Sequence, residues 1–340
     1  MENRRSFIKT MAGVTAGIMI PWGKVSGGNT ISSDKYGEVL PLRKLGKTGK
    51  DVTMLGLGGF HIGWTTEKDA QAVIETAING GIRFFDTAHS YEKGVSEERY
   101  GRYLIPNHRD QIFLMTKSTA RTRASLLEEF DLSLKRMQCD YVDLLQIHSL
   151  QSPDDVDKRL ENGVAEAALN ILSSGKAKYI GFTGHQSPYA HLRMMELLPA
   201  SHSFSTLQMP INPVDYSSEH SFVKQVIPTA LESNLGILAM KTLADGRFFN
   251  RKEAKGKVQW LTESPAIPDH LSVKEALFFA WSMPVSVLIT GAENVTLLEE
   301  KIELAKGFVS MSESERSALL TKVEQISDRK KIEYYKKIEG

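Results

Sequence analysis

Short apolar stretches alternate with longer amphipathic stretches along most of the chain. The short stretches are nearly continuous in apolar residues and end at turn-forming residues, as expected for strands that are covered on both faces. Because eight strand–helix units follow one another, the pattern predicts an α/β fold, a closed (β/α)8 TIM barrel. The predicted strands are Met54–Gly59, Ile82–Ala88, Ile112–Lys117, Asp143–His148, Tyr179–His185, Thr206–Ile211, Gly236–Thr242 and Val285–Gly291.

The stretches between these strands have the spacing of helices. Apolar residues recur every three or four positions in Glu67–Asn79 and again in Arg123–Met137, which predicts helices with one buried face. An open doubly wound sheet is the structural alternative. Dinucleotide-binding sheets of that kind usually carry a Gly-x-Gly-x-x-Gly turn before a helix. The glycines at 56, 58 and 59 lack that spacing, and no helix is evident directly after them.

Three further segments interrupt or extend the regular pattern. Leu40–Val52 predicts a hairpin that turns near Thr48-Gly49 and covers the N-terminal mouth of the barrel, after a polar linker over about residues 24–38. Ala244–Leu271 is a long polar loop after the seventh strand, on the face where barrel active sites lie. Ser312–Gly340 predicts a charged amphipathic helix that closes the barrel, with Leu319, Leu320 and Val323 facing inward.

The first residues resemble an export signal. Arg4-Arg5 lies in a basic opening that is followed by a short, uncharged, mostly apolar run from Met11 to Trp22. This run is too short for a membrane span, and the paired arginines are typical of a twin-arginine signal. We expect export to the periplasm by the twin-arginine machinery without stable membrane insertion, or a cytoplasmic protein if the signal is not used. The alternative is an uncleaved apolar tail. The predicted division is residues 1–32 for signal and linker, 39–330 for the barrel and 331–340 for a tail.

Composition excludes several other classes of protein. The 340 residues are 41% hydrophobic and 24% charged, with a net charge of +1. This balance is that of a folded globular protein and does not point to a nucleic-acid partner. The length suits one barrel with additions, although two ordinary domains would also fit. Cys139 is the single cysteine, so an internal disulfide or a cysteine metal cluster is excluded, and no metal site is predicted.

Four chemically active side chains are predicted to converge on the C-terminal mouth of the barrel. Asp86 ends the second strand, Tyr91 follows five residues later, Lys117 ends the third strand and His148 ends the fourth. Each has an ordinary structural explanation by itself, such as a turn cap for Asp86 or a buried hydrogen-bonded histidine. Together, at the correct ends of successive strands, they predict a catalytic site.

The chemistry of this set points to proton transfer beside a hydride carrier. A tyrosine phenol has a pKa of about 10, and a neighbouring ammonium group lowers it. Lys117 can act in this way on Tyr91, while Asp86 keeps Lys117 charged and fixed. Tyr91 then donates a proton to a carbonyl oxygen or accepts one from an alcohol, and His148 orients the substrate. A cofactor has to supply the hydride.

The residues around this set resemble the motifs of the aldo-keto reductase family. Gly81–Tyr91 (GIRFFDTAHSY) and Ser133–His148 (SLKRMQCDYVDLLQIH) carry the resemblance, which extends from about residue 40 to about residue 308. The resemblance implies a (β/α)8 barrel that uses NADPH, or sometimes NADH, without a metal. It also implies that Asp86, Tyr91, Lys117 and His148 are the catalytic tetrad.

The resemblance also implies a set of cofactor contacts. Gly58 lies at the end of the first strand, while Thr183 and Gln208 lie where the family hydrogen-bonds the nicotinamide carboxamide. Met240 replaces a tyrosine that many members stack on the nicotinamide, and Lys241 is within reach of the pyrophosphate. Next to Thr183 the family often has asparagine, where this chain has Gly184 and then His185.

The last strand departs most from the family pattern. Thr290-Gly291 matches the phosphate-binding turn before the final helix. Members that favour NADPH usually place a basic residue nearby, whereas this chain has Glu293, with Lys301 where asparagine is common. A carboxylate repels a 2′-phosphate and can bind a ribose hydroxyl, so we expect NADH or dual use. The alternative is that Glu293 points to solvent and that Lys301 restores phosphate binding.

Residues in the loops at the C-terminal mouth of the barrel predict the character of the substrate pocket. His61, Trp64 and Phe248 predict a pocket with aromatic walls and some polar contacts, which suits sugars and aromatic carbonyls. A small-molecule carbonyl or sugar hydroxyl is therefore the expected substrate. Two other functions use the same residues. One is a nicotinamide-binding sensor of a partner protein with little turnover, and the other is a redox-neutral sugar epimerase.

Overall fold

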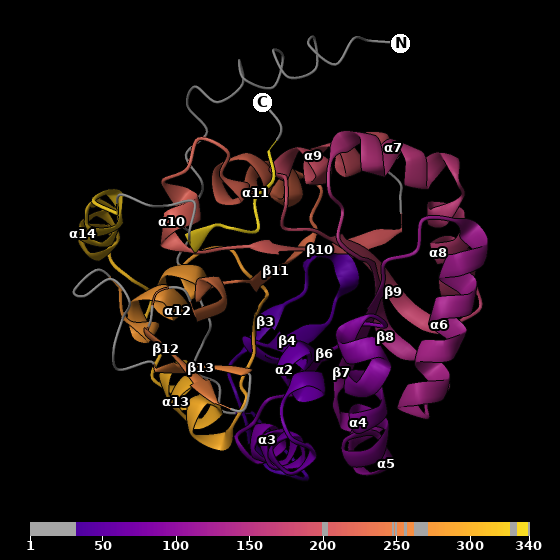
Figure 1. The fold of residues 1–340 in the computed structure, drawn as a ribbon, viewed down its shortest axis with the longest axis horizontal. Coiled ribbons are helices and arrows are strands. Elements are labelled where there is room, and N and C mark those ends of the chain that lie inside the picture. The colour runs from indigo at the N-terminus through magenta and orange to yellow at the C-terminus, as the bar shows by residue number, and fades with distance from the viewer. Residues whose placement is uncertain are drawn as a thin grey trace.

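The computed structural model describes residues 32–198, 203–246, 248, 250–254, 257–261, 271–326 and 332–338. Within these residues, eight parallel strands pair in a closed ring, in the order β10-β11-β14-β5-β6-β7-β8-β9. The predicted TIM barrel is confirmed, and each predicted strand has its counterpart (Figure 1). The barrel strands are β5 (Leu55–Gly58), β6 (Phe84–Asp86), β7 (Phe113–Ser118), β8 (Val142–Ile147), β9 (Ala177–Thr183), β10 (Phe204–Pro210), β11 (Gly236–Met240) and β14 (Val287–Thr290).

Helices surround the barrel on all sides, as the amphipathic pattern predicts (Figure 1). Several begin at side chains that accept a hydrogen bond from the first free backbone N–H groups. Thr122, Ser272 and Ser312 do this reciprocally with the residue three places on. The larger helices are α3 (Glu67–Asn79), α4 (Val95–Tyr103), α6 (Arg123–Met137), α7 (Pro153–Glu161), α8 (Val164–Ser173), α9 (Pro188–Leu197), α11 (Phe222–Glu232), α12 (Val273–Trp281), α13 (Val295–Lys306) and α14 (Glu313–Glu324). Short helices are α2 (Gly59–Trp64), α5 (Ile105–His108), α10 (Pro213–Tyr216), η1 (Gly46–Thr48), η2 (Tyr91–Gly94), η3 (Arg109–Gln111) and η4 (Ala244–Gly246).

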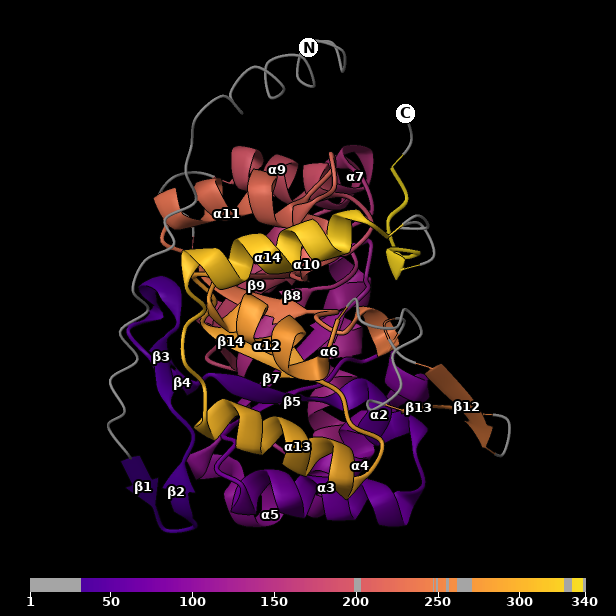
Figure 2. The same cartoon turned by 90° about the vertical axis from the view of Figure 1, so that its left-hand side faces the viewer.

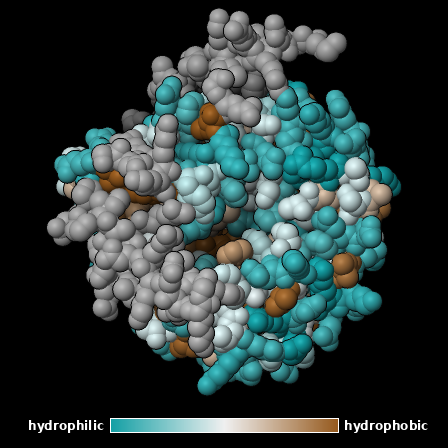
Figure 3. Space-filling view, in the orientation of Figure 1, coloured by the Kyte–Doolittle hydropathy of each residue, from teal (hydrophilic) through white to brown (hydrophobic). Residues whose placement is uncertain are grey.

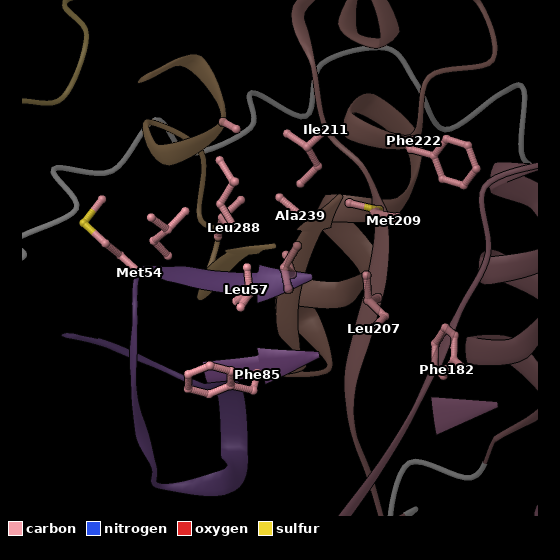
Figure 4. Close-up of a cluster of buried hydrophobic side chains, with 14 of the residues drawn as sticks. Met54, Leu57, Phe85, Phe182, Leu207, Met209, Ile211, Phe222, Ala239 and Leu288 are labelled. Atoms are coloured by element: carbon pink, nitrogen blue, oxygen red, sulfur yellow. The ribbon is translucent and has the colours of Figure 1, made fainter. Parts of the chain in front are cut away.

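Two hydrophobic layers hold the barrel together. The larger lies between strands and helices, and Figure 4 shows part of it, including Phe85, Phe182 and Leu207. The second fills the barrel itself, with side chains that include Phe84 and Leu144. Alternate residues of each strand therefore point inward and outward, and burial on both faces accounts for the continuous apolar runs in the sequence.

The predicted hairpin covers the N-terminal mouth of the barrel. Strands β3 (Leu42–Lys44) and β4 (Asp51–Thr53) pair antiparallel, and Leu45 and Val52 insert into the barrel's interior cluster. Gly46 has a positive φ of +48°, and a β-carbon there would overlap the backbone of Gly236. Glycine is therefore required where the hairpin meets the first residue of β11.

The linker predicted before this hairpin is wrong for its last residues. Strands β1 (Ser32–Asp34) and β2 (Gly37–Val39) form a second hairpin. Its anchor is Asp34, whose carboxylate accepts hydrogen bonds from Arg83 Nε at 2.5 Å and from the second guanidinium nitrogen at 2.8 Å. Asp34 and Arg83 are 49 residues apart in the chain. Polar composition alone therefore did not predict this hairpin.

The long loop after β11 and the C-terminal segment are also more structured than predicted. An antiparallel hairpin of β12 (Asn250–Ala254) and β13 (Lys257–Leu261) lies within the loop predicted as irregular, and residues 262–270 lie outside the described residues. The sequence also predicts no helix directly after the first barrel strand. That prediction is wrong, because the short helix α2 follows β5 directly. Figure 2 shows β12–β13 at the end of the barrel opposite the N-terminal hairpins.

The predicted C-terminal helix ends at Glu324 rather than continuing to the chain terminus. Leu319 and Val323 of α14 are buried as expected, and Leu320 is partly buried. The helix lies outside the barrel, where Lys322 Nζ donates to Glu275 of α12 at 3.0 Å, so it does not close an opening. Residues 332–338 return to the C-terminal mouth of the barrel.

The predicted export signal and the paired arginines lie outside the described residues. Among the helices that the structure describes, none has the length and apolar character needed to cross a bilayer.

Candidate active site

The carboxyl ends of the barrel strands bring the four predicted catalytic residues to one mouth. Asp86 is the last residue of β6, Lys117 lies near the end of β7, and His148 directly follows β8. Tyr91 begins η2 in the loop after β6. Figure 3 shows this face, with a small hydrophobic patch near its centre within mostly hydrophilic surface.

Lys117 is the central cation of the site. Its Nζ forms an ion pair with the carboxylate of Asp86 and donates hydrogen bonds to the Thr87 carbonyl at 2.8 Å and to Tyr91 Oη at 3.0 Å. Asp86 and Lys117 are only 2% and 1% exposed. A buried charge pair of this kind is stable only with good geometry and further hydrogen bonds, and here Lys117 makes two, to the Thr87 carbonyl and to the phenol. The predicted pairing of Asp86 with Lys117 is confirmed.

The loop after β6 holds Tyr91 over this ammonium group. The Tyr91 N–H donates to the Ala88 carbonyl at 3.0 Å, and the next two residues, Glu92 and Lys93, have positive φ angles of 48° and 58°. Such angles are uncommon for residues other than glycine, and they turn the chain so that α4 can begin at Val95. The Tyr91 ring meets Phe60 and His148 edge-on, with ring centroids 5.6 and 5.8 Å apart.

His148 is fixed through its backbone. Its N–H donates to the Ser118 carbonyl at 2.8 Å, and its own carbonyl accepts a bond of 2.8 Å from Arg159. Ring atom Nδ1 is buried and has no hydrogen-bond partner among the described residues. Burial lowers the pKa of His148 well below the ordinary histidine value, with a further contribution from Lys117. The imidazole is therefore neutral near pH 7 and can accept or donate one hydrogen bond.

The sequence predicts that Lys117 lowers the pKa of Tyr91, but this pKa is raised. Burial raises the pKa of Tyr91 above its ordinary value, and the ammonium of Lys117 opposes this without reversing it. Burial alone would lower the pKa of Lys117, but Asp86 and Tyr91 raise it overall. Burial likewise raises the pKa of Asp86 against the opposing effect of Lys117. The cofactor-free protein thus holds a protonated phenol beside a firmly charged ammonium group.

Two residues are placed to hold the carboxamide of a nicotinamide. Thr183 ends β9 and Gln208 lies on the adjacent strand β10, paired with it in register. The side-chain oxygen of Gln208 is buried and accepts no hydrogen bond from any residue that the structure describes. Such an unpaired acceptor is costly unless a ligand supplies a donor. These residues therefore fit the nicotinamide group that the sequence predicts. Their contacts with it stay a prediction.

The other predicted cofactor residues on the first and seventh strands have identified neighbours. A β-carbon at Gly58 would lie 3.2 Å from the Thr290 carbonyl oxygen, so close strand packing is sufficient to explain the glycine. Met240 ends β11 and is partly buried. Lys241 has a positive φ of 52° and forms a 2.7 Å ion pair with Asp245. This pairing turns the ammonium group toward η4.

The predicted phosphate turn lies between β14 and α13. Thr290 ends β14, and Asn294 caps the N-terminus of α13. Glu293 is 5% exposed and Lys301 is 4% exposed, so the alternative in which Glu293 points to solvent is wrong. Lys301 Nζ donates to the Gly291 carbonyl at 2.6 Å. Burial lowers the pKa of Lys301, and Glu293 opposes that shift.

Of the three residues predicted to line a substrate pocket, one is buried in the core and the other two contact each other. Phe248 is 1% exposed and belongs to the hydrophobic core, which gives it a packing role. Trp64 is partly buried and meets His61 edge-on at 5.8 Å. His61 packs against Gly291 of the phosphate turn. Phe60, which was not among the predicted residues, is 48% exposed and meets the Tyr91 ring edge-on at 5.6 Å.

The C-terminal segment contributes residues that sequence reasoning did not assign to the site. Tyr335 is buried, meets His185 edge-on at 6.0 Å and accepts a hydrogen bond of 3.1 Å from Asn212. The Lys241 ammonium lies 5.3 Å from the centroid of the same ring. The only signal in the sequence was the Tyr334-Tyr335 pair in a segment otherwise rich in charge. Among the residues that the structure describes, no group of three or more His, Cys, Asp or Glu side chains is arranged to hold a metal ion.

Comparison with known proteins assigns the family. The model of the aldo/keto reductase family matches residues 54–307, which includes every barrel strand and all four converging residues. The chain belongs to the aldo/keto reductase family.

The curated relatives are distant. An aldo-keto reductase of Bacillus subtilis (strain 168) is 32% identical over 215 residues, which is 58% of this chain and 61% of that protein. An L-glyceraldehyde 3-phosphate reductase of Escherichia coli O157:H7 is 29% identical over 232 residues, covering 63% of this chain and 64% of that protein. This chain therefore spans less than two thirds of these two relatives. An L-galactose dehydrogenase of Arabidopsis thaliana is 25% identical over 84% of this chain and 94% of that protein.

Solved structures have the same fold. The holo form of an aldo-keto reductase from Bacillus halodurans superposes with a TM-score of 0.66 at 21% identity, covering 84% of this chain and 96% of that chain. An aldo-keto reductase structure from Pseudomonas aeruginosa, described as putative in its own name, gives a TM-score of 0.59 at 22% identity, with coverage of 78% and 94%.

Proposed function

We propose that the protein is a nicotinamide-dependent reductase of small carbonyl compounds that also oxidises the corresponding alcohol or sugar hydroxyl. The observation that carries this proposal is the hydrogen-bonded row of Asp86, Lys117 and Tyr91 at the barrel mouth, beside a neutral His148. The expected substrate is a small molecule with a carbonyl or sugar hydroxyl. The relatives' names include reductases of an aldehyde phosphate and a sugar dehydrogenase.

The four residues divide the work of proton transfer. Tyr91 Oη carries the proton that a carbonyl oxygen receives during reduction, and it takes that proton back when an alcohol is oxidised. Lys117 donates to the same oxygen and stabilises the phenolate left behind. Asp86 holds the ammonium in place, and His148 hydrogen-bonds the substrate oxygen in its neutral form. The cofactor supplies or accepts the hydride when it is bound.

Thr183 and Gln208 would hold the carboxamide of the nicotinamide, and Met240 would pack on its ring. Thr290 and Gly291 would receive the phosphates at the start of α13, where free backbone N–H groups favour an anion. We propose that NAD(H) is preferred over NADP(H), or that both are used. Glu293 is buried at this turn in electrostatic contact with Lys301, and a carboxylate disfavours a 2′-phosphate.

Binding and turnover together test this proposal. The chain from about residue 33 is titrated with NADH and NADPH by fluorescence and then given aldehydes, ketones and sugars while cofactor absorbance is followed. The proposal predicts tight binding of NADH and substrate-dependent loss of its absorbance. Glu293→Gln should improve NADPH binding relative to NADH. If neither cofactor binds, the proposal is wrong.

The same experiment separates the two other functions. Cofactor that stays bound through purification, with little turnover on any substrate, favours a nicotinamide-binding sensor of a partner protein. Conversion of a sugar without any net change in cofactor absorbance favours a redox-neutral epimerase. We also propose, from the sequence of residues 1–32, that twin-arginine machinery exports the folded protein to the periplasm. Fractionation of cells that produce the full chain, with and without Arg4-Arg5 replaced by lysines, tests that proposal.

A further inference from the structure

The imidazole of His61 lies directly against the predicted phosphate turn. A β-carbon at Gly291 would overlap His61 Nδ1 and Cε1, so the glycine is what allows the ring to approach the turn. The contact follows from the barrel topology, because β5 pairs with β14 through Leu57 and Thr290. Helix α2 begins immediately after β5, and its third residue therefore reaches the turn that follows β14.

Charged side chains surround this imidazole from two neighbouring loops and one helix. Glu293 of the turn, Lys301 of α13, and Asp245 and Lys241 from the segment after β11 all act electrostatically on His61. Both lysines already have partners, since Lys301 Nζ donates to the Gly291 carbonyl at 2.6 Å and Lys241 Nζ pairs with Asp245 at 2.7 Å.

The imidazole itself lacks such a partner. His61 Nδ1 is buried and makes no hydrogen bond with any part of the chain that the structure describes. Other contacts hold α2: Arg99 of α4 donates to the Thr65 carbonyl at 2.9 Å, and the β-carbon of Glu92 in η2 lies near Gly63. The Arg99 hydrogen bonds hold the short helix, and the His61 ring faces the turn.

We infer that His61 is a cofactor-binding residue whose imidazole donates a hydrogen bond to the diphosphate of the dinucleotide at the Thr290–Gly291 turn. This inference rests on the proposed function, and it assigns to His61 a role different from the substrate contact that the sequence predicts. The anion would meet the N-terminus of α13 on one side and the imidazole on the other. Lys301 would reinforce the turn through its bond to the Gly291 carbonyl.

A pH dependence of cofactor binding follows. Burial lowers the pKa of His61 in the cofactor-free protein, with Glu293 opposing and Lys301 adding to the shift, so the ring is neutral near pH 7. A bound diphosphate raises the pKa of the ring, because opposite charge favours the protonated form. Binding then takes up a proton, and by linkage the affinity increases as the pH falls through the range between the two pKa values.

Titration calorimetry with ADP-ribose and with NADH measures this directly. ADP-ribose carries the diphosphate without the nicotinamide, so binding is read without catalysis. Each titration is run in two buffers with different heats of ionisation, at pH values about one unit below and one unit above the ordinary histidine pKa of about 6.5. The variants are His61→Gln and His61→Asn, each checked for an unchanged urea unfolding midpoint. His108→Gln is the control. Burial also lowers the pKa of His108, but this histidine lies in α5 and packs on Tyr36, and none of its hydrogen bonds or ring contacts within the described residues is with the phosphate turn.

The native chain and the His108 variant should take up a proton on binding either ligand and bind more tightly at the lower pH. Both His61 variants should bind about tenfold or more weakly at the lower pH, the usual loss for a hydrogen bond to a charged group, and should lose the proton uptake. Equal affinity with equal proton uptake in the variants would overturn the inference. Tighter binding by the variants would also overturn the inference, because the imidazole would then hinder binding of the diphosphate. If the native chain binds neither NADH, NADPH nor ADP-ribose, the proposed function has failed as well.

Discussion

The ammonium group of Lys117 donates a hydrogen bond of 3.0 Å to the phenol oxygen of Tyr91. Asp86 pairs with the same ammonium from the neighbouring strand. These contacts link β7, the end of β6 and the loop after β6. They place the phenol proton of Tyr91 beside an ammonium group that is fixed in position.

Removing the cation should impair activity and stability together. In Lys117→Met the phenolate loses its stabilising charge, and kcat should fall by about 10²- to 10⁴-fold. The variant also leaves the Asp86 carboxylate buried without its partner, which should cost about 3–5 kcal/mol of unfolding free energy near neutral pH. Urea unfolding and steady-state kinetics measure the two effects. The control is the double variant with Asp86→Asn, which should regain stability without regaining activity. Recovery of activity in the double variant would contradict the role of Lys117.

His148 should act in its neutral form. Burial lowers the pKa of His148 well below the ordinary histidine value, so the imidazole stays neutral as the pH falls through that ordinary value. At saturating cofactor, the rate of carbonyl reduction should therefore show no histidine limb between about pH 5.5 and 8. His148→Gln, which keeps a neutral hydrogen-bonding group, should retain more activity than His148→Ala across that range. An acid limb near pH 6.5 that disappears in His148→Gln would show that the charged form is needed.

The C-terminal segment should make stability depend on pH through Glu333. Burial and the neighbouring Asp215 raise the pKa of Glu333 to about 7, while Lys336, at 2.6 Å from its carboxylate, opposes the shift. The folded protein then binds more protons than the unfolded chain between the ordinary glutamate pKa and about pH 7, so the unfolding free energy falls as the pH rises through that window. The loss is at most about 3–4 kcal/mol.

Glu333→Gln should remove this part of the pH dependence. Urea unfolding of both proteins at about pH 5.5 and pH 8 gives the comparison, and the other titrating groups cancel in the difference. Parallel pH dependence in the two proteins would mean that Glu333 is ionised throughout.

The N-terminal hairpin should be part of the cooperative fold. Asp34 binds Arg83 with two hydrogen bonds, and both side chains are largely buried. Asp34→Ala should therefore lower the unfolding free energy by about 3 kcal/mol, since it leaves a buried guanidinium unpaired. Asp51→Ala is the matched control, because Asp51 pairs with an exposed lysine, Lys44, and such pairs contribute about 0–1 kcal/mol. Similar effects of the two variants would show that β1–β2 is not coupled to the barrel.

The barrel and the catalytic row were predictable because both depend on local patterns. Strand identity follows from continuous apolar runs, and the barrel topology then brings the ends of β6, β7 and β8 to one mouth whatever the loops do. Thr183 and Gln208 came from the family resemblance, and strand pairing places them side by side. Tyr335 was not predictable, because it reaches His185 across about half the length of the chain. The burial of Glu293 and the position of His61 depend on how two loops pack, and no periodicity encodes that packing.

The most direct test of the central claim compares the native chain with Tyr91→Phe in a single turnover. Each protein is loaded with NADH and mixed with an aldehyde that the native chain reduces, and the cofactor signal is followed. The account predicts equal cofactor affinity for both proteins and a loss of the reduction rate of about 10²-fold or more in Tyr91→Phe. The same reduction rate in both proteins would contradict the account, because the proton would then reach the substrate oxygen without Tyr91.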